Sequence, residues 1–150
     1  MTYTGQIPPS LASKVDPRII PFFERFYSVS DNPTAHDDYA DSFLPDADFV
    51  MGSKSVKGYD QVLELRKGLW NGPIHSRKHH LHKIFPFGEG DAGLECMLYG
   101  SVDYGLKNGK QLTLEWAARA VLAEYEGKEL RFKHYQVYLD SAPVANAAKD

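Results

Sequence analysis

Residues 94–125 read LECMLYGSVDYGLKNGKQLTLEWAARAVLAEY. Apolar and polar residues alternate on either side of the segment KNGK at 107–110, and alternation with a period of two predicts β-strands that bury one face. Similar runs lie at 79–87 and 129–140, and short glycine-containing segments separate all four runs. Four such strands in succession predict a curved antiparallel sheet.

The loop after residue 106 decides which side chains share a face of this sheet. A two-residue Asn108-Gly109 turn would place the apolar residues of the two flanking strands on opposite faces. A three-residue loop at 107–109, with Gly109 in the left-handed conformation, places them on one face, and we therefore expect it. A similar loop at 125–127, with Gly127 in the role of Gly109, aligns the strand 129–140 with that face.

In this register, the inward face of the sheet is apolar with a few separated polar groups, as is typical of a small-molecule pocket. The expected cross-strand rows are Gly100 with Trp116 and Gln136, Leu98 with Ala118 and His134, Val102 with Leu114 and Tyr138, and Tyr104 with Leu112 and Asp140. The reverse face combines Met97, Tyr99, Tyr135, Val137 and Leu139 with Glu95, Glu115, Arg119 and Arg131. A face that is half apolar and half charged predicts a homodimer contact.

The residues before Lys78 are expected to form three helices and two short strands. The first helix begins at Asp16-Pro17 and ends at 31–33, because Asp is a good cap and Pro suits the first helical position. Thr34 caps the second, which ends at 44–45, and the third runs from 58–60 to 71–73, with short strands at 47–51 and 55–57 between them. Helices on one face of a cupped sheet enclose a pocket, so the sequence predicts an α+β fold.

Length and composition limit the classes of protein. The 150 residues suit one domain, which we expect at 16–142, with a flexible arm at 1–15 and a tail at 143–150. A net charge of −3 without a basic stripe argues against a nucleic-acid partner. Cys96 lies in an apolar strand and is expected to be a buried thiol in a reducing compartment. Without a signal-like start or an apolar run of membrane-spanning length, we expect a cytoplasmic protein with no membrane partner.

Four strings carry a family resemblance: FERFY at 23–27, YADSFLPDA at 39–47, HHLH at 79–82 and YLD at 138–140. With the order of elements, they resemble the nuclear transport factor two-like superfamily and, within it, the SnoaL-like family. The resemblance covers roughly residues 16 to 142 and implies a cone-shaped α+β barrel, a curved antiparallel sheet wrapped around three N-terminal helices. It also implies a choice among polyketide cyclases, scytalone-type dehydratases, isomerases, epoxide hydrolases and non-catalytic binding modules.

The resemblance assigns roles to single residues. His79, at the start of the first long strand, is similar in position to the catalytic histidine of scytalone dehydratase-like proteins. Asp31 is similar to their pocket aspartate, and Tyr27 lies one helical turn before it. The tyrosine that dehydratases carry on the first short strand falls near Met51, and their second pocket histidine has no clear counterpart, although His134 could serve from another strand.

Histidines are the main candidates for chemistry. Four of the six lie between His75 and His82, and a histidine oriented by an aspartate is a sound acid/base unit near neutral pH. His79 with Asp31 is therefore the expected pair, although solvated histidines at a polar strand start are the simpler alternative. The spacing of His80 and His82 suits a metal, but no carboxylate follows closely, so we expect neither metal nor cofactor. His134 is either a third catalytic residue or a hydrogen-bonded core histidine.

The sequence favours a cofactor-independent lyase or isomerase of the dehydratase or cyclase type, acting by acid/base catalysis on a small, apolar, oxygenated metabolite. A polyketide, terpenoid or alkaloid of secondary metabolism would suit it. Nucleophile motifs and glycine-rich phosphate loops are absent from the sequence. The residues expected to contact substrate are Tyr27, Phe43, Trp70, His82, Tyr104, Trp116, Gln136 and Tyr138. The alternative is a non-catalytic ligand carrier or dimeric interaction module with the same pocket.

Overall fold

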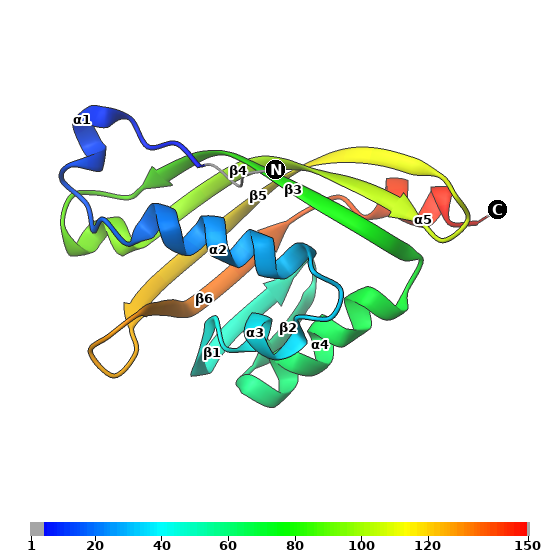
Figure 1. The fold of residues 1–150 in the computed structure, drawn as a ribbon, viewed down its shortest axis with the longest axis horizontal. Coiled ribbons are helices and arrows are strands. Elements are labelled where there is room, and N and C mark those ends of the chain that lie inside the picture. The colour runs from blue at the N-terminus through cyan, green and yellow to red at the C-terminus, as the bar shows by residue number, and fades with distance from the viewer. Residues whose placement is uncertain (1–4, 150) are drawn as a thin grey trace.

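The computed structural model describes residues 5–149 and contains one six-stranded sheet with helices on its concave face (Figure 1). The strands are β1 Phe43–Met51, β2 Lys54–Lys57, β3 Ile74–Pro86, β4 Glu95–Leu106, β5 Gln111–Glu124 and β6 Leu130–Tyr138. The helices are α1 Pro9–Ala12, α2 Ile19–Asp31, α3 His36–Ala40, α4 Tyr59–Asn71 and α5 Ala142–Ala147, with a 3-10 turn η1 at Asp91–Leu94. The predicted α+β fold is confirmed.

The strand order is β2-β1-β6-β5-β4-β3. The four long strands are antiparallel as expected, whereas β1 pairs with β6 in parallel, so the sheet is mixed. Its edge strands, β2 and β3, do not pair with each other, and the sheet stays open. In Figure 1, α2 crosses in front of the long strands, and α3 and α4 lie near β1 and β2.

Aromatic side chains fix α2 on the sheet. The ring of Phe26 packs edge-to-face on Phe132, with 4.7 Å between centroids, and on Tyr135 at 5.3 Å. Phe43 packs against Phe132 at 4.9 Å. Buried aromatic pairs of this geometry stabilise a core beyond the area they bury. Phe43 was expected to contact substrate, but it packs within this aromatic cluster and is not among the residues that line the cavity beside His79.

The expected register of β4 and β5 is confirmed. Gly100 lies opposite Trp116, and Leu98 lies opposite Ala118. The connecting loop has three residues, because the Leu106 amide donates to the Lys110 carbonyl at 2.8 Å and Gly109 has a φ of 88°. Both apolar sets therefore face the helices.

The expected register of β6 is wrong along the whole strand: up to Phe132 it is offset by two residues, which leaves the inward face as expected, and beyond Phe132 the face is wrong as well. Leu122 lies opposite Phe132 but Val121 lies opposite His134, so Lys133 is an extra residue in the strand. Such a β-bulge moves every later side chain to the other face. The loop before β6 also lies one residue later than expected, at 126–128, since the Tyr125 amide donates to the Glu129 carbonyl.

Because of the offset and the bulge, three of the predicted cross-strand rows do not form. His134, Gln136 and Tyr138 face away from the helices, and Ala118 lies opposite Val137 instead of His134. Tyr135 and Val137 are buried, whereas the Tyr138 side chain is exposed. Tyr135, Val137 and Leu139, expected on the reverse face, belong to the inward face.

The early helices differ from expectation at their ends. The first begins at Ile19, because the Asp16 carboxylate accepts hydrogen bonds from the backbone and side chain of Arg18. The second ends at Ala40, and residues expected to extend it begin β1 instead. Pairing of Phe43 with Phe132 across the sheet overrides the local helical pattern there. The predicted third helix is confirmed as α4.

The described parts of the chain ends have structure that the sequence pattern did not reveal. Residues 5–15, expected as an arm, contain α1, and Ile7 and Val15 from this segment are buried. Residues 142–147, expected largely as a tail, form α5, and Val144 lines a cavity. Residues 1–4 of the arm and residue 150 of the tail lie outside the described residues. Within 5–149, no helix is long and apolar enough to cross a membrane.

Candidate active site

The centre of the candidate site is a contact between the C-terminal end of α2 and the start of β3. The His79 ring Nδ1 lies 2.5 Å from Asp31 Oδ1, and the His79 backbone amide donates to Asp31 Oδ2 at 2.8 Å. The two carboxylate oxygens of Asp31 therefore both bond His79, one at its ring and the other at its backbone amide. The contact fixes the orientation of the ring before any ligand binds.

The surroundings favour a neutral imidazole. Burial lowers the pKa of His79 below its usual value, and the hydrogen bond and charge of Asp31 oppose this effect without reversing it. The side chains of His79 and Asp31 are only 15% and 6% exposed. A neutral ring donates Nδ1–H to Asp31 and keeps a lone pair on Nε2. No group in residues 5–149 bonds this Nε2, and His79 lines a cavity.

The cavity lies between the sheet and the helices and has a volume of about 180 Å³. Most of its wall is apolar. Its lining residues are Ser30, Tyr39, Met51, Leu69, Ile74, Arg77, His79, Val102, Tyr104, Trp116, Tyr135, Val137, Leu139, Ser141 and Val144. An apolar wall with a few polar groups is the usual composition of a small-molecule site.

Two tyrosines form a hydrogen-bonded pair beside His79. The hydroxyl oxygens of Tyr27 and Tyr135 are 2.9 Å apart, and the Tyr27 ring lies 5.0 Å from the His79 ring. Burial raises the pKa of both tyrosines; their hydrogen bond raises the pKa of Tyr27 further and lowers that of Tyr135. Either hydroxyl can donate in this pair. When Tyr27 donates, the Tyr135 proton is available to a ligand, because Tyr135 lines the cavity.

Two arginines satisfy carbonyl groups at the C-terminal end of α2. Arg66 is fully buried and donates to the carbonyls of Ser30 at 2.6 Å and Asn32 at 2.5 Å. Burial, and then the charge of Arg77, lowers the pKa of Arg66 to about 10, so it stays charged at neutral pH. Arg77 donates to the Ser30 carbonyl at 2.8 Å and stacks on Trp70 at 4.6 Å. These bonds pair carbonyls that a helix end leaves free and place positive charge at its negative pole.

The structure brings together some of the predicted residues and separates others. Tyr104 and Trp116 line the cavity with His79. Tyr27 and Asp31 stand behind the wall as partners of Tyr135 and His79. The indole of Trp70 packs on Arg66 and Arg77 instead of lining the cavity.

The remaining predicted residues face the other side of the sheet. His134 and Gln136 lie 3.3 Å apart there, through Nε2 and Oε1, and Tyr138 is 47% exposed. His82 is exposed at a bulge in β3 and contacts the Ser101 hydroxyl. The expectation that these four side chains reach the pocket is therefore wrong, because each follows or occupies a strand irregularity.

Tyr135 and Arg77 are among the polar groups of the cavity that the sequence pattern missed. A signal for Tyr135 is present in the sequence: two polar residues in succession, Lys133 and His134, separate the apolar positions Phe132 and Tyr135. A doubled polar residue in an otherwise alternating strand indicates a bulge. Arg77 precedes His79 by two residues on β3, so both side chains lie on the inward face. That spacing could have identified Arg77.

The outer face of β3 carries His80, next to His79 in the sequence. His80 Nε2 lies 2.7 Å from Asp103 Oδ2, and Thr113 donates to the other oxygen of this carboxylate. Among the residues that the structure describes, no three His, Cys, Asp or Glu side chains gather closely enough to hold a metal ion. The Cys96 thiol is buried, as expected, and burial raises its pKa to about 12.

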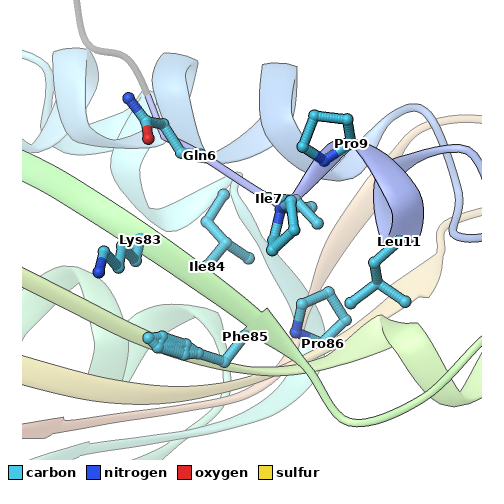
Figure 2. A pocket seen from close by; sticks show the side chains of 9 residues that line it. Gln6, Ile7, Pro9, Leu11, Lys83, Ile84, Phe85 and Pro86 are labelled. Atoms are coloured by element: carbon cyan, nitrogen blue, oxygen red, sulfur yellow. The ribbon is translucent and has the colours of Figure 1, made fainter.

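A second hollow, of about 510 Å³, lies on the outside of the molecule between residues 6–11 and the end of β3. Figure 2 shows its wall, where Ile7 and Ile84 approach each other and the rings of Pro9, Phe85 and Pro86 stand around them. Lys83 is the one titratable side chain in this lining. The hollow therefore lacks an acid/base pair, and the inner cavity is the better candidate for chemistry.

Solved structures of other proteins share this fold. No protein-family model matches the chain, and neither does any curated protein sequence. A proposed SnoaL-like polyketide cyclase from Jannaschia sp. CCS1 superposes with a TM-score of 0.69 at 14% identity, covering 96% of this chain and 97% of that one. ActVI-ORFA from Streptomyces coelicolor gives 0.68 at 14%, covering 84% and 98%. A proposed scytalone dehydratase from Novosphingobium aromaticivorans gives 0.68 at 12%, covering 83% of each chain.

Identities this low establish the fold and leave the activity open. The chain has the cone-shaped α+β fold of nuclear transport factor two-like proteins, and its neighbours include SnoaL-like and scytalone dehydratase-like proteins. The resemblance expected from the four sequence strings is thereby confirmed at the level of fold.

Proposed function

We propose that this protein is a cofactor-independent lyase or isomerase that uses His79 as its general base on a small oxygenated metabolite. The observation that carries the proposal is the pair of His79 and Asp31, in which Nδ1 of the ring lies 2.5 Å from the carboxylate while His79 lines the cavity. A neutral histidine oriented by a carboxylate, in an apolar cavity, is an arrangement well suited to general base catalysis.

His79 and Tyr135 act on different atoms of the substrate in this proposal. Nε2 of His79 removes a proton from a carbon beside a carbonyl group, and the resulting imidazolium is stabilised by Asp31. The Tyr135 hydroxyl donates a hydrogen bond to the carbonyl oxygen as negative charge develops on it. Returning the proton to a different carbon gives isomerisation. In dehydration, the hydroxyl group on the neighbouring carbon takes this proton from the His79 imidazolium and leaves as water while the carbon–carbon double bond forms.

The polar groups of the cavity favour an enzyme over a carrier. A carrier needs an apolar cavity, whereas this one also contains His79, Arg77 and the hydroxyls of Tyr39, Tyr104 and Tyr135. A cavity of about 180 Å³ is only about 7 Å across if spherical, so a ligand that fills it meets several of these groups at once.

Deuterium incorporation tests the proposal without the natural substrate being identified. The protein is incubated in heavy water with a panel of small enolisable ketones and β-hydroxy carbonyl compounds, and mass spectrometry measures exchange at carbon or loss of water. We expect exchange with the parent protein and its loss in His79→Ala. The matched control is His80→Ala, which removes the adjacent histidine from the outer face and should leave exchange intact.

Exchange at equal rates with the parent protein and His79→Ala would remove His79 as the base. Binding of panel members without any exchange or elimination would favour the ligand carrier instead.

The assembly is a separate proposal. The outer face of the sheet exposes Met97, Tyr99 and Tyr138 by 42%, 40% and 47%. Apolar side chains on a strand face with charged neighbours such as Glu95 and Arg119 suit a contact between two copies of the chain. We propose a homodimer through this face.

A further inference from the structure

The inner cavity is small for the ligands that its fold neighbours suggest. A dry cavity of about 150 Å³ accommodates one benzene ring, and the cavity beside His79 has about 180 Å³. A single ring with one or two short substituents fills this space. A polycyclic ligand would need the walls to move.

The fixed charges around the cavity favour an anion. Arg66 and Arg77 carry two positive charges, and Asp31 supplies one negative charge against them. Burial keeps His79 neutral by lowering its pKa. The C-terminal carbonyls of α2 offset part of the excess, but a positive balance remains in a mostly apolar enclosure, where charge is poorly screened.

Arg77 is the group placed to contact a negative ligand. Its Nε and Nη2 atoms donate to Ser30, and its guanidinium carbon lies over the Trp70 ring, 4.6 Å from the centroid, so contacts on two sides hold the side chain. Nη1 bonds no acceptor within residues 5–149, and Arg77 lines the cavity. A preorganised guanidinium with free donor capacity is suited to a carboxylate.

Tyr104 and Trp116 complete a pocket for a ring that carries such a group. Tyr104 lies opposite Arg77 on the neighbouring strand, and burial raises its pKa, so its hydroxyl stays protonated and can donate. The indole Nε1 of Trp116 already donates to the Ser101 carbonyl at 2.9 Å. What Trp116 offers the cavity is therefore its aromatic surface.

We propose that the ligand of this cavity is a compact monocyclic carboxylate, whose carboxylate group pairs with Arg77 and whose ring lies against Trp116. The inference names the substrate class of the site proposed above and rests on that site being the functional one. It differs from the polyketide or terpenoid class in both size and charge.

Binding measurements with three probes test this inference. Isothermal titration, supported by quenching of tryptophan fluorescence, compares benzoate with benzamide, a neutral molecule of the same shape, and with 9-anthracenecarboxylate, an anion of three rings. We expect benzoate to bind at least about tenfold more tightly than benzamide, because a charge-assisted hydrogen bond is stronger than a neutral one. Anthracenecarboxylate should bind more weakly than benzoate.

Two variants assign the preference to Arg77. Arg77→Met should reduce benzoate affinity to that of benzamide and leave benzamide binding unchanged. The control, Lys83→Met, removes a positive charge from the exposed part of the same strand and should change neither. Circular dichroism verifies that both variants fold. If Arg77→Met fails to fold, the comparison of the three probes on the parent protein still tests the inference.

Three results would overturn the inference: benzamide binding as tightly as benzoate, the three-ring acid binding as tightly as benzoate, or Lys83→Met losing as much affinity as Arg77→Met. The test is separate from that of catalysis. A preference for benzoate without any exchange chemistry would leave the ligand class standing and remove the enzyme. Exchange chemistry restricted to neutral ketones would leave the proposed enzyme standing and remove the carboxylate as its ligand class.

Discussion

Asp31 and His79 lie 48 residues apart in sequence, and the two oxygens of Asp31 bond the ring and the backbone amide of His79 at 2.5 and 2.8 Å. The aspartate therefore joins the end of α2 to β3 and sets the tautomer of the ring. The same side chain serves the fold and the proposed chemistry, and substitutions at it should affect both.

Asp31→Asn should lower kcat by about 10²- to 10⁴-fold, because an amide can donate to Nδ1 and turn the proton of the ring to Nε2. KM for the same substrate should change little, since Asp31 stands behind the cavity wall. Steady-state kinetics on a substrate found in the exchange screen measure both. A kcat within threefold of the parent would contradict the orienting role.

The stability of the protein should fall at acidic pH partly through His79. Its pKa is lowered in the folded state from 6.5 by burial, so below pH 6.5 the unfolded chain binds the proton more tightly. Unfolding is therefore favoured as pH falls from 6.5 toward the folded pKa. Urea titrations at pH 7.5 and 5.5 should show a smaller loss of unfolding free energy in His79→Gln than in the parent. An equal loss would contradict the assignment.

The value of kcat/KM should also depend on the protonation of His79 and should fall, like the stability, as the pH falls. The base form of His79 persists below pH 6.5 because its pKa is lowered, so kcat/KM should hold at mildly acidic pH and fall only below it. A pH–rate profile measures this limb. A limb that remained unchanged in His79→Ala would belong to another group.

Deletion of Lys133 should destabilise the fold much less than deletion of Gln136. Removing the extra residue of the bulge leaves a regular strand in which Tyr135 and Val137 still face inward, whereas removing Gln136 directs Val137 to solvent and turns Tyr138 inward. Exposing a buried side chain such as Val137 costs roughly 1.5–3 kcal/mol, but the exposed Lys133 side chain contributes little. Chemical unfolding of both variants provides the comparison. Similar stabilities would mean that the strand can shift its register.

Gly100→Ala should destabilise the protein by about 1–3 kcal/mol, as overpacking a core does. An added Cβ would lie 2.3 Å from the His80 carbonyl oxygen and 2.8 Å from the Trp116 ring. The matched control is Gly68→Ala on α4, where an added Cβ meets no atom within 4 Å and helix propensity favours alanine. Thermal unfolding should therefore shift in opposite directions for the two variants.

Met97→Glu should convert the proposed homodimer into a monomer, because it adds charge to an apolar part of the outer sheet face. Sedimentation velocity measures the change. The control is Phe87→Glu, which places the same charge at a side chain 80% exposed beyond the end of β3. A monomeric parent protein, or a dimer in both variants, would exclude this face as the contact.

The sequence by itself determined the elements whose signals are local. Alternation through 94–106 and 111–125, with the position of Gly109, specified the register of β4 and β5, because turn length fixes which side chains share a face. Capping and helix-ending residues located α4 in the same way. The resemblance of short strings to a known family supplied the fold and the pair of Asp31 and His79.

The tertiary structure decided what depends on several elements at once. The bulge at Lys133 lies where β6 pairs with β5 on one side and β1 on the other, and it moved Tyr135 into the cavity and His134 out of it. Arg66 and Arg77 reach the same carbonyl of Ser30 from α4 and β3. Neither arrangement follows from a periodic pattern, because each depends on where distant backbone groups lie once the helices have packed on the sheet.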